Sequence, residues 1–152
     1  MKAAYINPFI NAVRRLFKTM TDLPLRVGQP GLNQDAHPHH DVCGIIDLSG
    51  DVRGRVVVSM SEPLATTLAS ELLGDPVAQM SGDCVDAVGE IANMIAGNAR
   101  TDFPEGSHTI SVPRVVIGRE KVPYSDRIPV ISIPCETDKG ALYIDIALKV
   151  GR

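Results

Sequence analysis

The stretch VCGIIDLSGDVRGRVVVSM, residues 42–60, decides the fold class of this chain, because two apolar runs enclose a turn sequence. Ser-Gly-Asp at 49–51 has the composition of a tight turn, and the flanking runs are short enough to pair as an antiparallel β-hairpin. Three successive valines at 56–58 favour a buried strand. We therefore expect a hairpin with a buried second strand.

A helix is expected directly after this hairpin, in SEPLATTLASELLGD, residues 61–75. Ser61 suits the N-cap, Pro63 suits the first turn, and Gly74 comes just after the last helical residue.

An amphipathic helix is expected near the start of the chain, with Asn7 as N-cap and Pro8 at the first helical position. Its apolar residues recur at steps of three and four: Ile6, Phe9, Ile10, Val13, Leu16, Phe17 and Met20. The opposite side carries Lys2, Arg14, Arg15 and Lys18, so a membrane-surface anchor is one alternative. A helix that covers the core of the domain is the interpretation we favour.

A segment without periodicity, GQPGLNQDAHPHHD at residues 28–41, is predicted to be a loop. It carries a cluster of possible metal ligands: Asp35, His37, His39, His40 and Asp41. Imidazole and carboxylate groups suit zinc or nickel, but a site needs fixed geometry, which we do not expect of this loop. We therefore predict no metal site.

Three strands are expected at the end of the chain: TISVPRVVIG at 109–118, PVISIPCE at 129–136 and ALYIDIALKV at 141–150. TDKG at 137–140 has the composition of a hairpin turn between the last two. The period of two in residues 143–150 predicts a strand with one face in water.

The order of these elements predicts an α+β fold, with helices against a mainly antiparallel sheet of about five strands. The length of 152 residues suits a single domain over 1–152.

The net charge of −3 argues against a nucleic-acid-binding protein. Without a signal peptide or an apolar run long enough to span a bilayer, we expect a cytoplasmic protein. The three cysteines, Cys43, Cys84 and Cys135, suit reduced core thiols.

The second helix after the hairpin is expected from Asp83 to Thr101, with Ser81 or Asp83 as N-cap. Each helical residue advances about 100° around the axis, so the apolar and polar residues of this segment fall on opposite sides. The apolar side consists of Val88, Ile91, Ala92, Ile95 and Ala99.

A narrow polar stripe on this helix consists of Asp86, Glu90, Asn93 and Gly97. Polar residues occupy the solvent-exposed face of any surface helix, and solvent exposure alone explains most polar stripes of this kind. Asn is a mediocre helix former, however, and glycine inside a helix costs about 1 kcal/mol relative to alanine. Both observations favour a surface that another molecule approaches.

Conventional active sites are not indicated. Asp86 and Glu90 lie one helical turn apart, but carboxylates on an exposed helix lack the burial that raises a pKa for acid–base catalysis. We find no Ser-His-Asp or Cys-His grouping, phosphate-binding glycine loop or CxxC motif.

The motif D-x-x-x-E-x-x-N at residues 86–93 resembles the signature of the CheC/CheX/FliY phosphatase family of bacterial chemotaxis, and the likeness is greatest to the CheX-like members. Further likeness lies in NPF at 7–9, the hairpin at 44–60, LLGD at 72–75 and ETDKG at 136–140. This chain carries one such motif and in this respect resembles the CheX-like proteins, whereas CheC carries two. The His-rich loop has no counterpart in this resemblance.

The resemblance implies a CheC-like fold, with two long helices on a sheet, and a phosphatase that hydrolyses the phosphoaspartate of a CheY-like receiver domain. Asn93 would orient the attacking water, and Glu90 would pair with the receiver's lysine. Asp86 and Gly97 would contact the receiver. A magnesium ion would belong to the receiver, so no cofactor is expected in this chain, and a homodimer through sheet edges is expected. A receiver-binding module without catalysis and a flagellar-switch adaptor stay open as alternatives.

Overall fold

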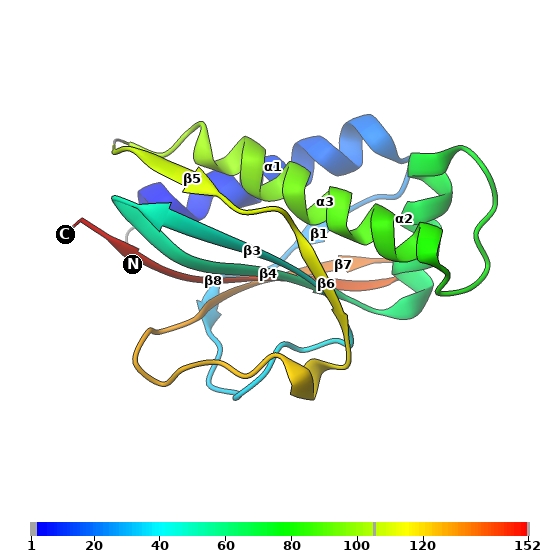
Figure 1. Ribbon diagram of the computed structural model, residues 1–152. Coiled ribbons are helices and arrows are strands. Elements are labelled where there is room, and N and C mark those ends of the chain that lie inside the picture. Colours follow the sequence, from blue (N-terminus) through cyan, green and yellow to red (C-terminus); the bar gives the residue numbers. More distant parts are fainter. Residues whose placement is uncertain (1–2, 105, 152) are drawn as a thin grey trace.

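The computed structural model describes residues 3–104 and 106–151, which form three helices on one face of a sheet (Figure 1). The helices are α1 (Ala3–Met20), α2 (Glu62–Leu73) and α3 (Gly82–Arg100). The strands are β1 (Arg26–Val27), β2 (Gly31–Leu32), β3 (Val42–Gly50), β4 (Val52–Met60), β5 (His108–Ile110), β6 (Arg114–Ile117), β7 (Ile131–Thr137) and β8 (Gly140–Val150). A short 3-10 helix, η1 (Arg119–Lys121), follows β6. The predicted α+β class is confirmed.

The sheet has the order β1-β7-β8-β4-β3-β5, with β2 also paired to β7 and β6 also paired to β3. All pairs are antiparallel. The predicted hairpin is confirmed, with Val42 opposite Met60 and the turn at Gly50 and Asp51. The second predicted hairpin is confirmed as well, since Thr137 lies opposite Gly140.

The strand predicted over 109–118 is two strands, and this part of the prediction was wrong. Ser111, Val112 and Pro113 lie between β5 and β6, and both strands pair with β3. Proline has no amide hydrogen for a sheet ladder, so an edge strand breaks easily there. The two-residue strands β1 and β2, the latter inside the predicted loop, bring the sheet to eight segments where about five were expected.

The two predicted caps of α2 are confirmed. The Ser61 side chain accepts a hydrogen bond from the Leu64 amide, and Gly74 ends the helix in the left-handed conformation, with a φ of 75°. Pro63 lies in the first turn.

The predicted start of α1 was wrong, because Pro8 lies inside the helix and Asn7 is not its N-cap. The extra turn is stabilised by tertiary packing: Tyr5 is buried, and its ring lies 5.3 Å from that of Phe103. The packing of Tyr5 offsets the free-energy cost of the helical hydrogen bond that Pro8 cannot donate. The apolar side of α1 packs on the core, as predicted, while Lys2 lies outside the described residues.

The main core lies between the helices and the sheet. Val56 and Val58 face it, whereas Val57 faces a smaller cluster on the other side of the sheet, with Val122 and Ile45. The segments at 28–41 and 118–130 cover part of that second side, which is the lower side in Figure 1. The three cysteines are free and buried, as predicted. Among the described residues, no helix is long and apolar enough to cross a membrane.

Candidate functional site

Helix α3 is capped at its N-terminus and packs closely on the sheet. The Ser81 side chain caps its N-terminus by accepting a hydrogen bond from the Cys84 amide at 3.4 Å. The predicted apolar side is fully buried, with Val88, Ile91 and Ala92 at 0% exposure. A Cβ atom at Gly44 of β3 would lie only 2.7 Å from that of Ala92, so this glycine lets the helix approach the strand closely. A helix seated in this way can hold a polar group in a constant position.

The polar stripe lies on the outer side of α3, as predicted. Asp86 and Glu90 are exposed, and Asn93 and Gly97 are half-buried. The side-chain hydrogen bonds of this helix involve residues near its two ends, such as Ser81 and Arg100. With respect to residues 3–104 and 106–151, the side chains of Asp86, Glu90 and Asn93 form neither hydrogen bonds nor ion pairs. Their donors and acceptors are available to another molecule.

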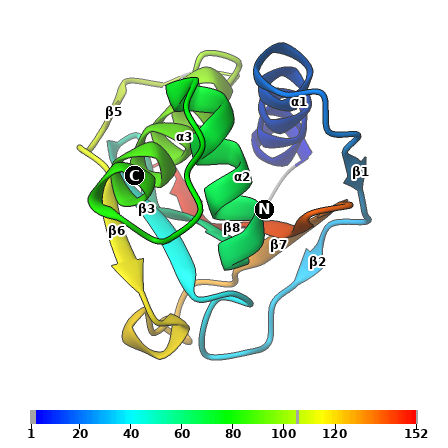
Figure 2. The same ribbon diagram turned by 90° about the vertical axis from the view of Figure 1, so that its right-hand side faces the viewer.

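The segment that joins β5 to β6 runs beside α3 (Figure 2). A Cβ atom at Gly89 of α3 would lie 3.7 Å from Pro113, and the neighbouring Val112 is 82% exposed. Among the described residues, a Cβ atom at Gly97 would meet only Ile110, at 3.9 Å, so packing against them does not require this glycine. The stripe is therefore flanked by an exposed apolar residue and is open at Gly97.

The His-rich loop is held in place but does not gather ligands. The ring of His39 stacks on Tyr143, with centroids 4.1 Å apart and planes within 7°. Burial lowers the pKa of His40, and the nearby His39 lowers it further. Throughout the described parts of the chain, no group of three or more His, Cys, Asp or Glu side chains has the arrangement of a metal site.

A second polar cluster, which the sequence analysis missed, surrounds Asp145 on β8. The alternating pattern predicts one face of β8 in water, and Asp145 lies on that face with Tyr143 and Lys149, yet it is only 1% exposed. The carboxylate accepts hydrogen bonds from the hydroxyls of Ser132 and Tyr124, each at 2.6 Å, and from the Asn33 amide at 3.4 Å. Tyr124 and Asn33 belong to the two segments that cover this side of the sheet, so the cluster fastens both segments to β8.

Burial governs the ionisation of this cluster. It raises the pKa of Asp145, and the hydrogen bonds from Ser132 and Tyr124 oppose that rise. It also raises the pKa of Tyr124, and the adjacent Asp145 carboxylate adds to the effect. Tyr124 is therefore a neutral hydrogen-bond donor to Asp145. The only polar hydrogen of its hydroxyl is engaged in this bond.

Comparison with known proteins shows which family the chain resembles. Residues 42–136 match the family model described as Chemotaxis phosphatase CheX. The chain is 26% identical over 123 residues to the CheY-P phosphatase CheX of Thermotoga maritima, which is 79% of each protein. The crystal structure of the chemotaxis protein CheX from Desulfovibrio desulfuricans superposes with a TM-score of 0.85 at 27% identity, covering 95% of this chain and 99% of that one. A CheX–CheY–BeF3–Mg complex from Borrelia burgdorferi gives a TM-score of 0.79 at 23% identity, covering 95% and 97%.

Proposed function

The chain belongs to the chemotaxis phosphatase CheX family, as its motif predicts, and we propose that it hydrolyses the phosphoaspartate of a CheY-like receiver domain in chemotaxis or another two-component pathway. The relative from Thermotoga maritima is named for this substrate. The observation that carries the proposal is the stripe on α3, where two exposed carboxylates and a half-buried amide form no hydrogen bond with the rest of the described chain.

The proposed role of Asn93 is to orient the attacking water. In this reaction the water oxygen bonds to phosphorus and the bond from phosphorus to the aspartyl oxygen breaks, which leaves inorganic phosphate and a free carboxylate. The transition state of such a transfer is loose and needs an in-line nucleophile more than a strong base. An amide oxygen accepts a hydrogen bond from the water and holds it in line. Because Asn93 lies on a helix that packs on the core, its backbone is already in position before docking.

The proposed role of the neighbouring groups is docking. Glu90 lies nearly one turn before Asn93 and is exposed, so it can form a charge-assisted pair with the receiver's lysine. Asp86 extends the same negative side, Val112 adds apolar contact area, and Gly97 leaves room for close approach. A magnesium ion would be held by the receiver, and this chain would need no cofactor.

The proposed homodimer would pair two copies through a sheet edge. One edge is made by β5 and β6 and the other by β1 and β2, and all four strands are short. Sedimentation velocity over a range of concentrations tests this pairing, since a monomer at all concentrations would contradict it.

The test of function uses the protein at a small fraction of the receiver concentration. A phosphatase releases phosphate from many receivers per molecule, so the whole receiver pool loses its phosphate faster than it does alone. A receiver-binding module without catalysis leaves the pool unchanged under these conditions, although it binds the phosphorylated receiver. A flagellar-switch adaptor would capture switch proteins in a pull-down and fail to bind the receiver.

A further inference from the structure

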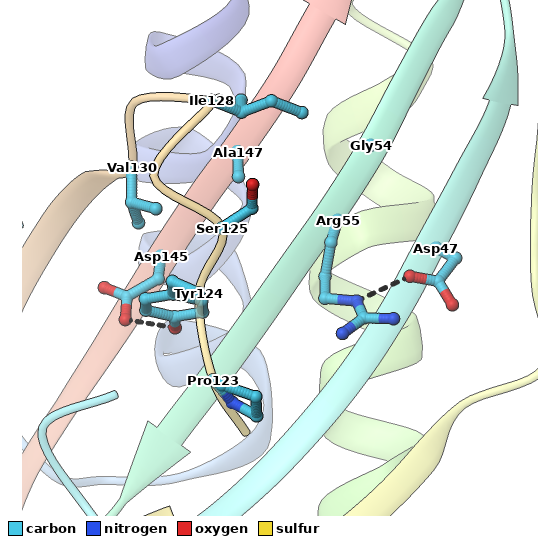
Figure 3. Close-up of a pocket in the computed structure, with 10 residues that line it drawn as sticks. All are labelled: Asp47, Gly54, Arg55, Pro123, Tyr124, Ser125, Ile128, Val130, Asp145 and Ala147. Carbon is cyan, nitrogen blue, oxygen red and sulfur yellow. Dashed lines mark hydrogen bonds and ion pairs between the residues drawn. The ribbon is translucent and has the colours of Figure 1, made fainter. Parts of the chain in front are cut away.

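A cavity of about 330 Å³ lies on the side of the sheet opposite to the helices (Figure 3). Gly54 of β4 and Ala147 of β8 line it from the sheet, and because both residues are small they leave the sheet surface uncovered. Pro123, Ile128 and Val130 line it from the segment that crosses above the sheet. The cavity therefore has a mostly apolar lining.

One end of this cavity carries positive charge. Nε of Arg55 donates to Oδ1 of Asp47 at 2.8 Å, and the second carboxylate oxygen lies 3.9 Å from Nη2 of Arg114. Two guanidinium groups thus share one carboxylate, which leaves a net positive charge. The Arg55 side chain is 39% exposed, and its two terminal nitrogens donate no hydrogen bond within the described residues.

At the other end of the cavity, Tyr124 donates a hydrogen bond to Asp145. Figure 3 shows Asp145 and Tyr124 together, away from Arg55 and Asp47. The Asp145 carboxylate already accepts three hydrogen bonds, from Ser132, Tyr124 and Asn33. The Asp145 oxygens are therefore occupied by donors of the described residues, and the cationic donors in the cavity lining are those of Arg55.

We infer that this cavity binds a small organic carboxylate, with the carboxylate group on Arg55 and an apolar body between Gly54, Ala147 and Ile128. A guanidinium group with free donors matches the geometry of a carboxylate. An apolar cavity of about 150 Å³ holds benzene, so about twice that volume accommodates an aromatic ring with a short acid chain. The inference does not depend on the phosphatase activity, because the stripe lies on the opposite side of the sheet.

The experiment titrates the full chain, labelled with nitrogen-15, with 4-phenylbutyrate and with the neutral analogue 4-phenylbutyramide. Amide chemical shifts should move saturably with the acid, and the largest changes should be at Arg55, Tyr124 and Ala147. The amide analogue should bind at least about fivefold more weakly, since it lacks the charge. Equal binding of the two compounds, or no saturation by the acid below about 10 mM, would overturn the inference.

Three variants separate the cavity from the general surface charge. Arg55→Gln should weaken binding of 4-phenylbutyrate at least about fivefold. Arg53→Gln is the matched control on the same strand, because Arg53 is outside the cavity lining and donates to the Gly151 carbonyl. Ala147→Leu should abolish binding, because the larger side chain fills the cavity while Arg55 and Arg53 are unchanged. Equal weakening by Arg53→Gln, or retained binding by Ala147→Leu in a folded protein, would contradict the proposed site.

Discussion

The stripe on α3 and the cluster around Asp145 lie on opposite sides of the same sheet, and both combine carboxylate and amide groups. Around Asp145 every carboxylate oxygen has a partner within the chain, and the group is 1% exposed. On the stripe, Glu90 and Asp86 are exposed and Asn93 is half-buried, and none has a side-chain partner in the described residues.

This difference separates polar residues that stabilise the fold from polar residues that are available for recognition. A buried polar group whose partner is removed costs folding free energy, whereas an exposed group without a partner costs little when it is removed. Substitutions at the cluster should therefore affect stability, and substitutions at the stripe should affect the reaction with the receiver.

The largest expected effect is that of Asn93→Ala on phosphate release. We expect the rate at saturating receiver to fall by about 10²- to 10³-fold, the usual effect of removing a positioned group from a reacting centre. Affinity for the receiver should stay within a few-fold, since Glu90 is retained. Asn98→Ala is the matched control, because Asn98 is exposed on the same helix and lies outside the stripe. A parallel loss of binding and turnover would contradict a water-positioning role.

At the buried cluster, Asp145→Ala should lower the free energy of unfolding by about 3 kcal/mol, because three donors lose their acceptor. Urea denaturation measures this change. Asp138→Ala is the control, since Asp138 is 71% exposed and pairs with Arg26 only at 3.5 Å, a contact worth about 0 to 1 kcal/mol. A negligible effect of Asp145→Ala would show that the cluster does not hold the covering segments.

The pH dependence of Asp145→Asn sharpens the same test. Because burial raises the pKa of Asp145 in the folded state, its contribution to stability is fully present below the unfolded pKa of about 3.9 and is lost as pH rises through the folded pKa. The stability of the native protein relative to Asp145→Asn should thus fall as pH is raised from about 4. A rise in this relative stability over the same pH range would mean that the hydrogen bonds lower the pKa of Asp145 more than burial raises it.

Glu90→Ala should weaken binding of the phosphorylated receiver about tenfold and leave the unfolding free energy within about 0.5 kcal/mol. Glu71→Ala on α2 is the matched control, since Glu71 is also exposed and lies on another helix. Isothermal titration with both variants measures the difference. Unchanged affinity after Glu90→Ala would remove the proposed pair with the receiver's lysine.

Gly97→Ala should raise the unfolding free energy by about 0.5 to 1 kcal/mol, because alanine is the better helix former and its Cβ has room. Receiver binding should weaken a few-fold if another surface approaches at this point. Gly82→Ala, where a Cβ atom would meet nothing within 4 Å among the described residues, is the control at the start of the helix. Tighter binding by Gly97→Ala would rule out a close approach there.

Much of the fold was predictable from local sequence patterns. The hairpin at 42–60, the caps at Ser61 and Ser81 and the polar stripe on α3 depend on spacing, turn chemistry and capping within short segments. Residues close in sequence stabilise these features, and the tertiary packing favours the same conformations, so the elements predicted from local patterns are present in the structure.

The features that were missed depend on contacts between distant segments. Asp145 follows the alternation of a wet strand, but Tyr124 and Asn33 come from segments 21 and 112 residues away and cover it. The additional turn before Pro8 depends on packing of Tyr5 against Phe103. No local pattern contains either partner, which is why burial of a lone polar residue is difficult to predict from periodicity.

The most direct test of the account compares phosphate loss from one phosphorylated CheY-like receiver with the wild-type protein, with Asn93→Asp and with neither. Aspartate keeps the shape of the side chain and replaces the amide by a carboxylate, which is a base and repels the phosphoryl group. The account predicts that the wild type accelerates phosphate loss and that Asn93→Asp does not. Acceleration by Asn93→Asp equal to that of the wild type, or no acceleration by the wild type, would contradict it.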